Sequence, residues 1–526
     1  MQLITPKLVA TLDKCKVSDR DAVRILSATA EALGHDVTNI VINRNSICRC
    51  RKRLRSEIAG NIFDKFKEQS LPFVTVHWDG KILPNVTGVE HLDRLPVIIT
   101  SGVIEQMLGV PAITSGKGQY QADAVFEALQ KWNITDRVQA FCFDTTASNT
   151  GRFQGACVLL EQKLERDILY LPCRHHIYEI ILKTVFDNIV GQSFGPGILI
   201  FKDFREEWAT MDKLKFTPGI SDEYVKEKLS NITDLLDFSM KCLKEQQLRE
   251  DYRELLELMV IFLGGIPPRG ISFRMPGAFH HARWMAKGIY CLKIYLFRNQ
   301  FLIAKKGIER IRDVCIFVVY LYVKAWIHSP LAIEAPLQDL KFLNDLYLYK
   351  GINEQISQLA LLKFCNHLWY LSPEPAALAF FDENVSDETK LQMVEAVKTT
   401  DISEENVKKV SVHPKNLDEY LGRSIDYFIT QKSQRFFERF SINNDFLNMH
   451  PSEWKNNENY KNGLKIASGL KVVNDVAERG VQLMEEYNKI LSKNEDDKQF
   501  ILQIVSDYRK LYPDVNKSTL LVPFPS

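Results

Sequence analysis

The hydrophobic pattern of the chain changes near residue 70, from helical spacing to short apolar runs. The first 70 residues show helical spacing, and Ser18 is placed to cap a helix over Asp19–Leu33. Short apolar runs then predict three β-strands, at Phe73–Asp79, Ile82–Leu83 and Leu95–Thr100. We therefore expect a helical N-terminal region followed by a β-sheet.

Helices and strands alternate after the third predicted strand. Apolar spacing predicts a helix over Tyr120–Trp132, and the run Val138–Asp144 predicts a fourth strand. A helix at Phe153–Glu165, a strand at Ile168–Leu171 and a helix at His175–Ile189 follow. This order of elements, three strands followed by alternating helices and strands, is that of the ribonuclease H-like fold. We predict an α/β protein with a mixed sheet of this type, in which the first and fourth strands are neighbours.

Long helices dominate the rest of the chain. Charged stretches such as Asp222–Leu248 alternate with apolar ones such as Ile311–Ile327. In the last long helix, Lys471–Leu491, Glu478 lies about 140° from the apolar stripe that contains Val473. The expected regions are a helical N-terminal region (1–70), the first part of the core (71–195), an α-helical insertion (196–450) and the helical C-terminal part of the core (451–526).

The bulk composition is that of a globular protein with more than one domain. The 526 residues exceed one compact core, and 45% are hydrophobic and 25% charged. The ten cysteines show no disulfide-framework spacing and no signal peptide is apparent, so we expect reduced thiols inside a cell. The longest strongly apolar run, Val314–Val323, is too short to cross a bilayer, so no membrane association is expected.

Positive charge is concentrated in one segment. The net charge of +1 gives the whole chain no attraction for nucleic acid, but cations outnumber anions in residues 43–67. A solvated helix face and a phosphate-binding surface explain this segment equally well. In the second interpretation Arg51 and Arg53 contact DNA.

Two predicted strands end in a carboxylate, at Asp79 and at Asp144. Aspartate often ends strands because it suits turns. Parallel neighbouring strands, however, would place both carboxylates at one sheet edge, where they repel unless a cation joins them. Together with a carboxylate from a helix they could hold Mg²⁺ (or Mn²⁺), which activates a water or a 3′-hydroxyl for phosphoryl transfer. This ordered pair favours a metal site.

Two further patches contain residues with functional chemistry. Cys173-Arg-His-His176 directly follows a predicted strand; it is a weak zinc signal, and a polar contact near the sheet edge suits it better. Arg283-Trp284 lies in a helical segment, where amphipathic packing and base stacking with phosphate contacts are both open.

Taken in order, these patches resemble the hAT superfamily of DNA transposases over roughly residues 71–500. Trp78-Asp79 ends the first strand, and Asp144-Thr-Thr-Ala-Ser-Asn149 is similar to the family's Asp-x-x-Ala-Ser-Asn block. Cys173-Arg-His-His176 matches its Cys-x-x-His motif, and Arg283-Trp284 its Arg-Trp pair. Ala477-Glu478-Arg479 resembles the segment that carries the third acidic residue.

The resemblance implies a ribonuclease H-like core interrupted by a large α-helical insertion. Asp79, Asp144 and Glu478 would bind the catalytic Mg²⁺ (or Mn²⁺). Cys173 and His176 would position DNA, and Trp284, beside Arg283, would stack near a flipped base. The implied partners are transposon ends and target DNA, bound by a homo-oligomer in the nucleus.

The sequence also departs from the family pattern. Residues 1–70 hold no Cys/His set for the family's N-terminal zinc-binding BED finger, and Gly480-Val481-Gln482 replaces the usual Phe-Ser. Asp475 and Glu485 remain alternatives for the third ligand. From the resemblance we expect a metal-dependent DNA transposase that cleaves and joins DNA strands. The departures leave a catalytically inactive, domesticated DNA- or protein-binding protein as the alternative. Another ribonuclease H-like nuclease ranks last.

Overall fold

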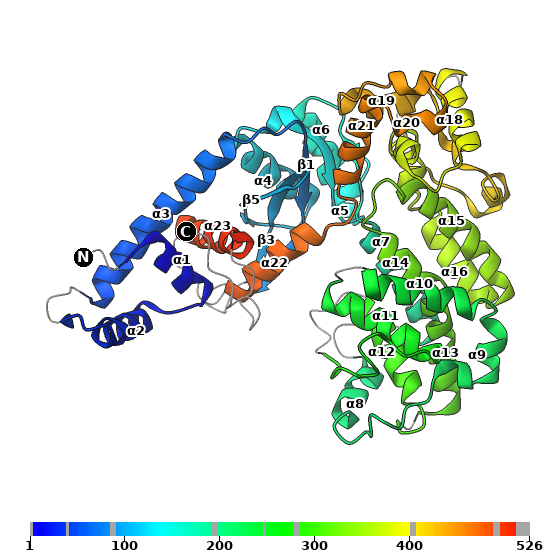
Figure 1. The fold of residues 1–526 in the computed structure, drawn as a ribbon, viewed down its shortest axis with the longest axis horizontal. Helices are drawn as coiled ribbons and strands as arrows, with labels where there is room; N and C mark the ends of the chain where they lie inside the picture. The colour runs from blue at the N-terminus through cyan, green and yellow to red at the C-terminus, as the bar shows by residue number, and fades with distance from the viewer. Residues whose placement is uncertain are drawn as a thin grey trace. The chain divides into compact units, whose positions relative to one another are not determined.

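The protein is a mixed α/β protein, 64% helical, and the predicted fold class is confirmed at this level. The structure is a computed structural model that describes residues 4–37, 42–84, 91–191, 198–245, 248–277, 285–301, 303–399, 407–487 and 495–511. The chain divides into two compact units (Figure 1). The first unit contains Met1–Leu169 and Asn474–Ser526, and the second contains Tyr170–Val473.

A five-stranded mixed sheet forms the centre of the first unit, in the order β5-β4-β1-β7-β8. The strands are β1 (Val74–Trp78), β4 (Val97–Ser101), β5 (Ile104–Gly109), β7 (Val138–Cys142) and β8 (Leu169–Tyr170). Strand β1 pairs antiparallel with β4 and parallel with β7, and β4 pairs antiparallel with β5. Every residue of β1 and β4 is buried, including the polar Thr75 and His77 of β1, so both faces of these strands are covered.

A second, three-stranded sheet accounts for one error in the sequence prediction. The strand predicted at Ile82–Leu83 lies within β2 (Lys81–Pro84), which pairs with β3 (His91–Arg94), and β3 in turn pairs with β6 (Ala112–Ile113). The prediction also lacked β3 and β6 of this second sheet and β5 of the main sheet. Gly102, with φ +58°, sits in the turn between Ser101 and Ile104 and permits this tight hairpin.

Helices cover the main sheet. They are α4 (Gly118–Lys131), α5 (Ala147–Thr150), α6 (Ala156–Leu164), α22 (Asp475–Tyr487) and α23 (Glu495–Leu511). Helix α4 packs against α6, while α22 lies beside β4 and β1, and α23 beside β5 (Figure 1). A Cβ atom at Gly480 would lie 2.8 Å from Ile98 Cδ1, so only glycine lets α22 pack this closely on β4.

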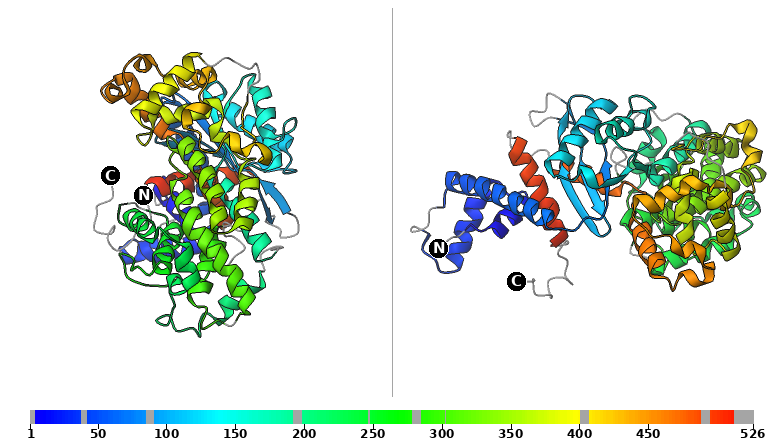
Figure 2. Two further views of the ribbon diagram at one scale, coloured as in Figure 1. Left: turned by 90° about the vertical axis from the view of Figure 1, so that its right-hand side faces the viewer. Right: turned by 90° about the horizontal axis from the view of Figure 1, so that it is seen from above.

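The N-terminal region is helical, as predicted. It forms α1 (Pro6–Lys14), α2 (Asp19–Ala32) and α3 (Arg44–Lys67). Ser18 caps α2 by accepting a hydrogen bond from the backbone N–H of Asp21 at 3.1 Å, so this cap prediction is confirmed. Helix α23 packs against α1 and α3, and Figure 2 shows it beside these helices. The N-terminal helices are therefore part of the first unit.

The second unit is built from helices. In chain order they are α7 (Arg174–Ile189), α8 (Leu199–Glu207), α9 (Glu223–Lys228), α10 (Ile232–Glu245), α11 (Glu250–Phe262), α12 (Met285–Leu296), α13 (Lys305–Phe317), α14 (Val323–His328), α15 (Ala335–Leu348), α16 (Glu354–Phe364), α17 (Pro373–Ala376), α18 (Asp387–Thr399), α19 (Gln434–Arg439), α20 (Pro451–Trp454) and α21 (Glu458–Gly469). A five-residue π-helix, Val318–Tyr322, joins α13 to α14.

The two ends of the second unit meet. The backbone N–H of Arg174 donates to the carbonyl of Val472 at 2.9 Å. The chain therefore enters and leaves this unit at one place, as an insertion into the first unit requires. The insertion extends from Tyr170 to Val473, so it includes α7, α20 and α21, which were predicted to belong to the core. No described helix is long and apolar enough to cross a membrane.

Candidate functional site

The C-terminal ends of β1 and β7 lie side by side and lead to the two aspartates. In their parallel pairing Val76 lies opposite Phe141, and His77 opposite Cys142. Asp79 and Asp144 each come two residues after this last pair, so both leave the sheet at the same edge. Both residues are half-buried. The predicted adjacency of the two strands is therefore confirmed.

One oxygen of Asp144 is held by three donors. Its Oδ1 accepts hydrogen bonds from Thr146 Oγ1 at 2.7 Å, Thr146 N at 3.3 Å and Asn149 Nδ2 at 2.5 Å. No described residue donates a hydrogen bond to Oδ2. The local turn therefore fixes the carboxylate through one oxygen and leaves the other as a hard donor for a cation.

Asn149 connects Asp144 to the first strand. Its Oδ1 accepts a hydrogen bond from Trp78 Nε1 at 2.9 Å, while its Nδ2 donates to Asp144. An indole N–H can only donate, so the amide oxygen must face Trp78 and the amide nitrogen must face Asp144. Trp78 is fully buried and stacks on Phe143 at a centroid distance of 5.6 Å. The Trp-Asp pair and the Ala-Ser-Asn block thus form one assembly.

Glycines allow the segment after Asn149 to fold tightly against α4. A Cβ atom at Gly118 would lie 2.2 Å from the carbonyl oxygen of Gln154 and 2.7 Å from that of Ser148. A Cβ atom at Gly155 would lie 2.5 Å from the carbonyl oxygen of Asn149. Side chains are excluded at both positions, and this close packing fixes the backbone that carries Asn149.

A buried polar chain holds the start of α22 at the end of β1. Asn474 Nδ2 donates to the carbonyl oxygen of Trp78 at 2.9 Å, so its Oδ1 faces His77 Nδ1, 3.3 Å away. His77 Nε2 lies 3.0 Å from Thr100 Oγ1. With Nδ1 as the donor to Asn474, Nε2 accepts from the Thr100 hydroxyl, and a neutral imidazole satisfies both contacts. Asn474 was not among the predicted site residues, because no sequence motif marks it.

Glu478 lies one helical turn after Asn474. Its backbone N–H donates to the Asn474 carbonyl at 3.2 Å, and its side chain is half-buried. Residues four apart share a helix face, so Glu478 and Asn474 lie on the same side of α22. Among the described residues, however, no group of three or more His, Cys, Asp or Glu side chains could hold a metal ion. The aspartates share an edge, but the three carboxylates do not form a complete metal site, and Asp475 and Glu485 remain alternatives to Glu478.

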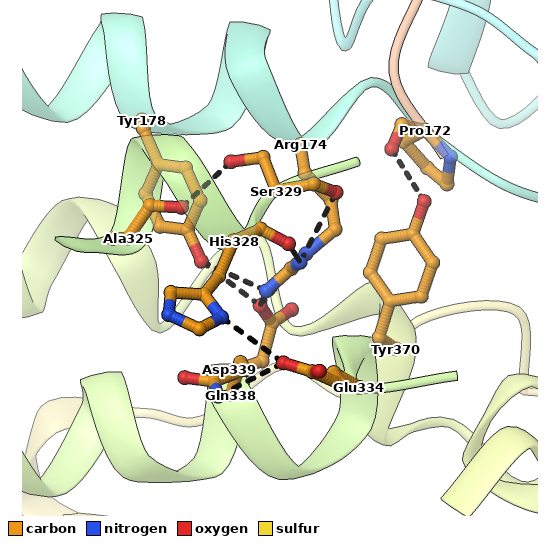
Figure 3. A network of polar contacts seen from close by, with 10 residues as sticks. All are labelled: Pro172, Arg174, Tyr178, Ala325, His328, Ser329, Glu334, Gln338, Asp339 and Tyr370. Atoms are coloured by element: carbon orange, nitrogen blue, oxygen red, sulfur yellow. Dashed lines mark hydrogen bonds and ion pairs between the residues drawn. The ribbon is translucent and has the colours of Figure 1, made fainter. Parts of the chain in front are cut away.

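The Cys173–His176 patch opens α7 in the second unit. Cys173 and the two residues after it are buried, and His176 is half-buried. Arg174 donates to Asp339 Oδ1 at 2.7 Å and to the Tyr178 hydroxyl at 3.0 Å, as Figure 3 shows. His175 stacks on Trp326 at a centroid distance of 3.9 Å. These contacts of Arg174 and His175 hold α7 to α14 and α15.

The remaining predicted contacts differ in accessibility. Arg51 is only 4% exposed and binds Asp13 at 2.5 Å and Asp19 at 2.8 Å, so its charge stabilises the N-terminal helices and is not available to DNA in this structure. The side chain of Arg53 is 63% exposed and lies 3.7 Å from Glu57. Arg283 and Trp284 lie outside the described residues.

Comparison with known proteins gives no family assignment. Neither the protein-family models nor the curated proteins searched contain a match to this chain.

Proposed function

We propose that the protein is a metal-dependent polynucleotidyl transferase of the DNA transposase type, which cleaves and joins DNA strands. The observation that carries the proposal is the parallel register of β1 and β7, which brings Asp79 and Asp144 to one sheet edge. The strand order β5-β4-β1-β7-β8, with β4 antiparallel to β1 and β7 parallel to it, supports a ribonuclease H-like core.

The donor set fits Mg²⁺ or Mn²⁺. Both cations prefer hard oxygen ligands, and Mg²⁺ is commonly bound by one or two carboxylates together with water and substrate phosphates. Asp79 and Asp144 would hold the cation, with Glu478 as the third carboxylate. When bound, the cation would activate the attacking water or 3′-hydroxyl and stabilise the leaving oxygen.

The protein's own residues position these ligands. Thr146 and Asn149 orient Asp144 through its Oδ1. Asn474 holds the N-terminus of α22 at the carbonyl of Trp78, and this contact would fix the position of Glu478, one helical turn further on, relative to the sheet edge. Two acidic groups at one edge repel each other, so this scaffold also holds them together before a cation binds.

A DNA substrate is supported by the charge of the N-terminal region. Residues 1–70 contain 13 lysines and arginines against 8 aspartates and glutamates, although the whole chain carries only +1. Arg49, Lys52 and Arg53 are exposed on α3, where they are available to phosphates. A homo-oligomer acting in the nucleus follows from the same proposal, because joining DNA ends requires more than one active site.

Strand cleavage by the purified full-length chain tests the proposal. With Mg²⁺ or Mn²⁺ the protein is expected to nick and join DNA, and Asp79→Ala and Asp144→Ala are each expected to abolish both reactions while retaining the wild-type thermal melt. Cleavage that survives both substitutions would contradict the proposal. Nicking without any joining would favour a ribonuclease H-like nuclease.

A catalytically inactive DNA- or protein-binding protein is the second candidate. The observation in its favour is that no group of three metal-ligating side chains exists among the described residues. Titration of Mn²⁺ by calorimetry separates the two. Binding that disappears in Asp144→Ala supports the enzyme, and DNA binding without Mn²⁺ binding supports the inactive protein.

A further inference from the structure

A cavity of about 270 Å³ lies in the first unit between the β4–β5 hairpin, α22 and α23. Its lining includes Val476, Arg479, Gly480 and Leu483 of α22. These residues belong to the helix side that packs on β4, whereas Asn474 holds the same helix at β1. The cavity is therefore distinct from the carboxylate edge, although one helix contributes to both.

The floor of the cavity is apolar and well packed. Ile98, Met107, Val476 and Leu483 line it, and each is at most 5% exposed. All four belong to the core cluster that joins the sheet to α22 and α23. A ligand on this floor would gain from burying apolar surface, and its floor contacts would include α22 itself.

The rim of the cavity is cationic. Arg479, Arg509 and Lys510 line it, and Glu105 is the one acidic residue among the described lining residues. Arg479 binds the Glu105 carboxylate at 2.5 Å, whereas the Lys510 ammonium donates to the Glu105 backbone carbonyl. Glu105 pairs with Arg479, and Glu486, outside the lining, pairs with Arg509, so the three rim cations exceed these two carboxylates by one positive charge.

Arg509 retains an unused donor. Its Nη2 binds Glu486 at 2.6 Å, and Glu486 also lies 3.9 Å from Lys16. Its Nε is buried and has no hydrogen-bond partner among the described residues. A buried donor without a partner costs free energy, and a ligand oxygen could remove that cost.

We propose that this cavity binds a small phosphate monoester with a compact apolar body. The apolar part would lie on Ile98, Met107 and Leu483, and the phosphate would meet the rim cations. A phosphate group suits this rim because its three terminal oxygens can accept from both guanidinium groups and the ammonium. The volume lies just below the range usual for drug-sized ligands, so the apolar body is no larger than a single ring.

Occupancy of the cavity would also act on catalysis, an effect that rests on the proposed function. The ligand would contact Val476 and Gly480, which lie two residues before and after Glu478. A shift of α22 would therefore move Glu478 relative to the sheet edge. Phosphoryl transfer is then expected to change with ligand concentration, whereas binding itself requires no catalysis.

Calorimetry with phenyl phosphate as the probe tests the binding site in the full-length protein. The titration is done in EDTA so that the carboxylate edge holds no cation. Phenyl phosphate is expected to bind at least about tenfold more tightly than inorganic phosphate, because only phenyl phosphate covers the floor. Phenol, which lacks the anion, is expected not to bind.

Variants assign the binding to this cavity. Arg479→Gln and Lys510→Gln should each weaken phenyl phosphate binding about tenfold, and Ser506→Phe, which fills the cavity, should abolish it. Arg53→Gln, at an exposed cation of α3, and Asp144→Ala should leave binding unchanged. Equal affinity for phenyl phosphate and inorganic phosphate, or undiminished binding in Ser506→Phe, would overturn the proposal. Loss of strand cleavage in Asp144→Ala with unchanged phenyl phosphate binding would show that the two sites are separate.

Discussion

Single amide side chains determine how the carboxylates of the first unit are presented. Asn149 and Asn474 each use both ends of their amide, the first between Trp78 and Asp144, the second between His77 and the Trp78 carbonyl. Both are buried, so removing either one leaves polar groups without partners. Each residue should therefore affect both stability and activity.

Asn149→Ala tests the link between the first strand and Asp144. The substitution leaves the buried Trp78 N–H without an acceptor and Asp144 without one donor, so we expect a loss of about 1–3 kcal/mol in the free energy of unfolding, measured with urea. Strand cleavage should fall strongly. Asn149→Asp retains an acceptor for Trp78 but places a second charge beside Asp144, and it should lower cleavage further. Wild-type cleavage by both variants would contradict the role given to Asn149.

Lys287, on α12, is a buried cation whose protonation links stability to pH. It is 2% exposed, and desolvation lowers its pKa to about 8, against the attraction of Asp187 at 3.9 Å. In the unfolded chain a lysine titrates near pH 10.4. Between these two values the unfolded state binds more protons, so stability rises with pH across this window.

Lys287→Met should therefore stabilise the protein at pH 7, by about 1–3 kcal/mol, because it removes the cost of burying a charge. The difference in free energy of unfolding between Lys287→Met and the wild type should shrink as the pH rises from about 8 to 10. Urea unfolding at several pH values measures this difference. Lys183→Met is the matched control, since Lys183 is exposed and pairs with the same Asp187 at 3.8 Å. Its effect should be small and independent of pH in this range.

At the scale of elements, the N-terminal ends of α22 and α4 pack against the segments that carry the candidate site residues. Asn474 fixes the start of α22, and Gly118 allows the start of α4 to lie against the segment that follows Asn149. Neither residue is a candidate ligand. Asn474 acts on the position of α22, and Gly118 on the backbone that carries Asn149.

Asn474→Ala should loosen α22 over the sheet edge. We expect cleavage to require a higher Mg²⁺ concentration, because Glu478 is then held less firmly. Stability should fall by about 1–3 kcal/mol. Asn457→Ala, which removes the cap of α21 in the second unit, should cost about 1 kcal/mol without changing the Mg²⁺ dependence. An unchanged Mg²⁺ dependence in Asn474→Ala would argue against this positioning role.

Gly118→Ala tests the packing of α4. The added methyl group would meet the Gln154 and Ser148 carbonyls at less than 3 Å, so we expect destabilisation of about 1–3 kcal/mol in urea unfolding. Gly60→Ala, in α3, has no atom within 4 Å of the added Cβ. This control should stabilise the protein by about 0.5–1 kcal/mol, because alanine loses less backbone freedom in a helix.

At the scale of the whole molecule, one helical unit is inserted into an α/β unit. The hydrogen bond from Arg174 to Val472 closes the base of the insertion, and the buried Arg174–Asp339 pair holds α7 inside it. The fragment 170–473 should therefore fold alone as a helical domain. Circular dichroism should show a cooperative thermal transition of this fragment. Arg174→Met should lower the midpoint temperature of the transition, because the substitution leaves Asp339 buried without its partner. A fragment that melts without cooperativity would contradict an independent core.

The sequence by itself determined the local elements, because burial periodicity is a property of neighbouring residues. The apolar runs ending at Asp79 and Asp144, the Ser18 cap and the helical character of the insertion were all recognisable in this way. The β5 strand was missed because the polar Glu105 and Gln106 interrupt its apolar pattern. The strand at Ile82–Leu83 was wrongly placed in the main sheet because its partner β3, which in turn pairs with β6, comes from later in the chain.

Tertiary structure alone decided how these elements meet. It set the register of β1 against β7, brought Asn474 to the end of β1, almost 400 residues away in sequence, and buried Arg51 against Asp13. None of these contacts leaves a periodic signal, since each depends on which distant residue fills the space beside a side chain. The two aspartates could therefore be predicted as strand ends, but the amides that orient them could be found only in the folded chain.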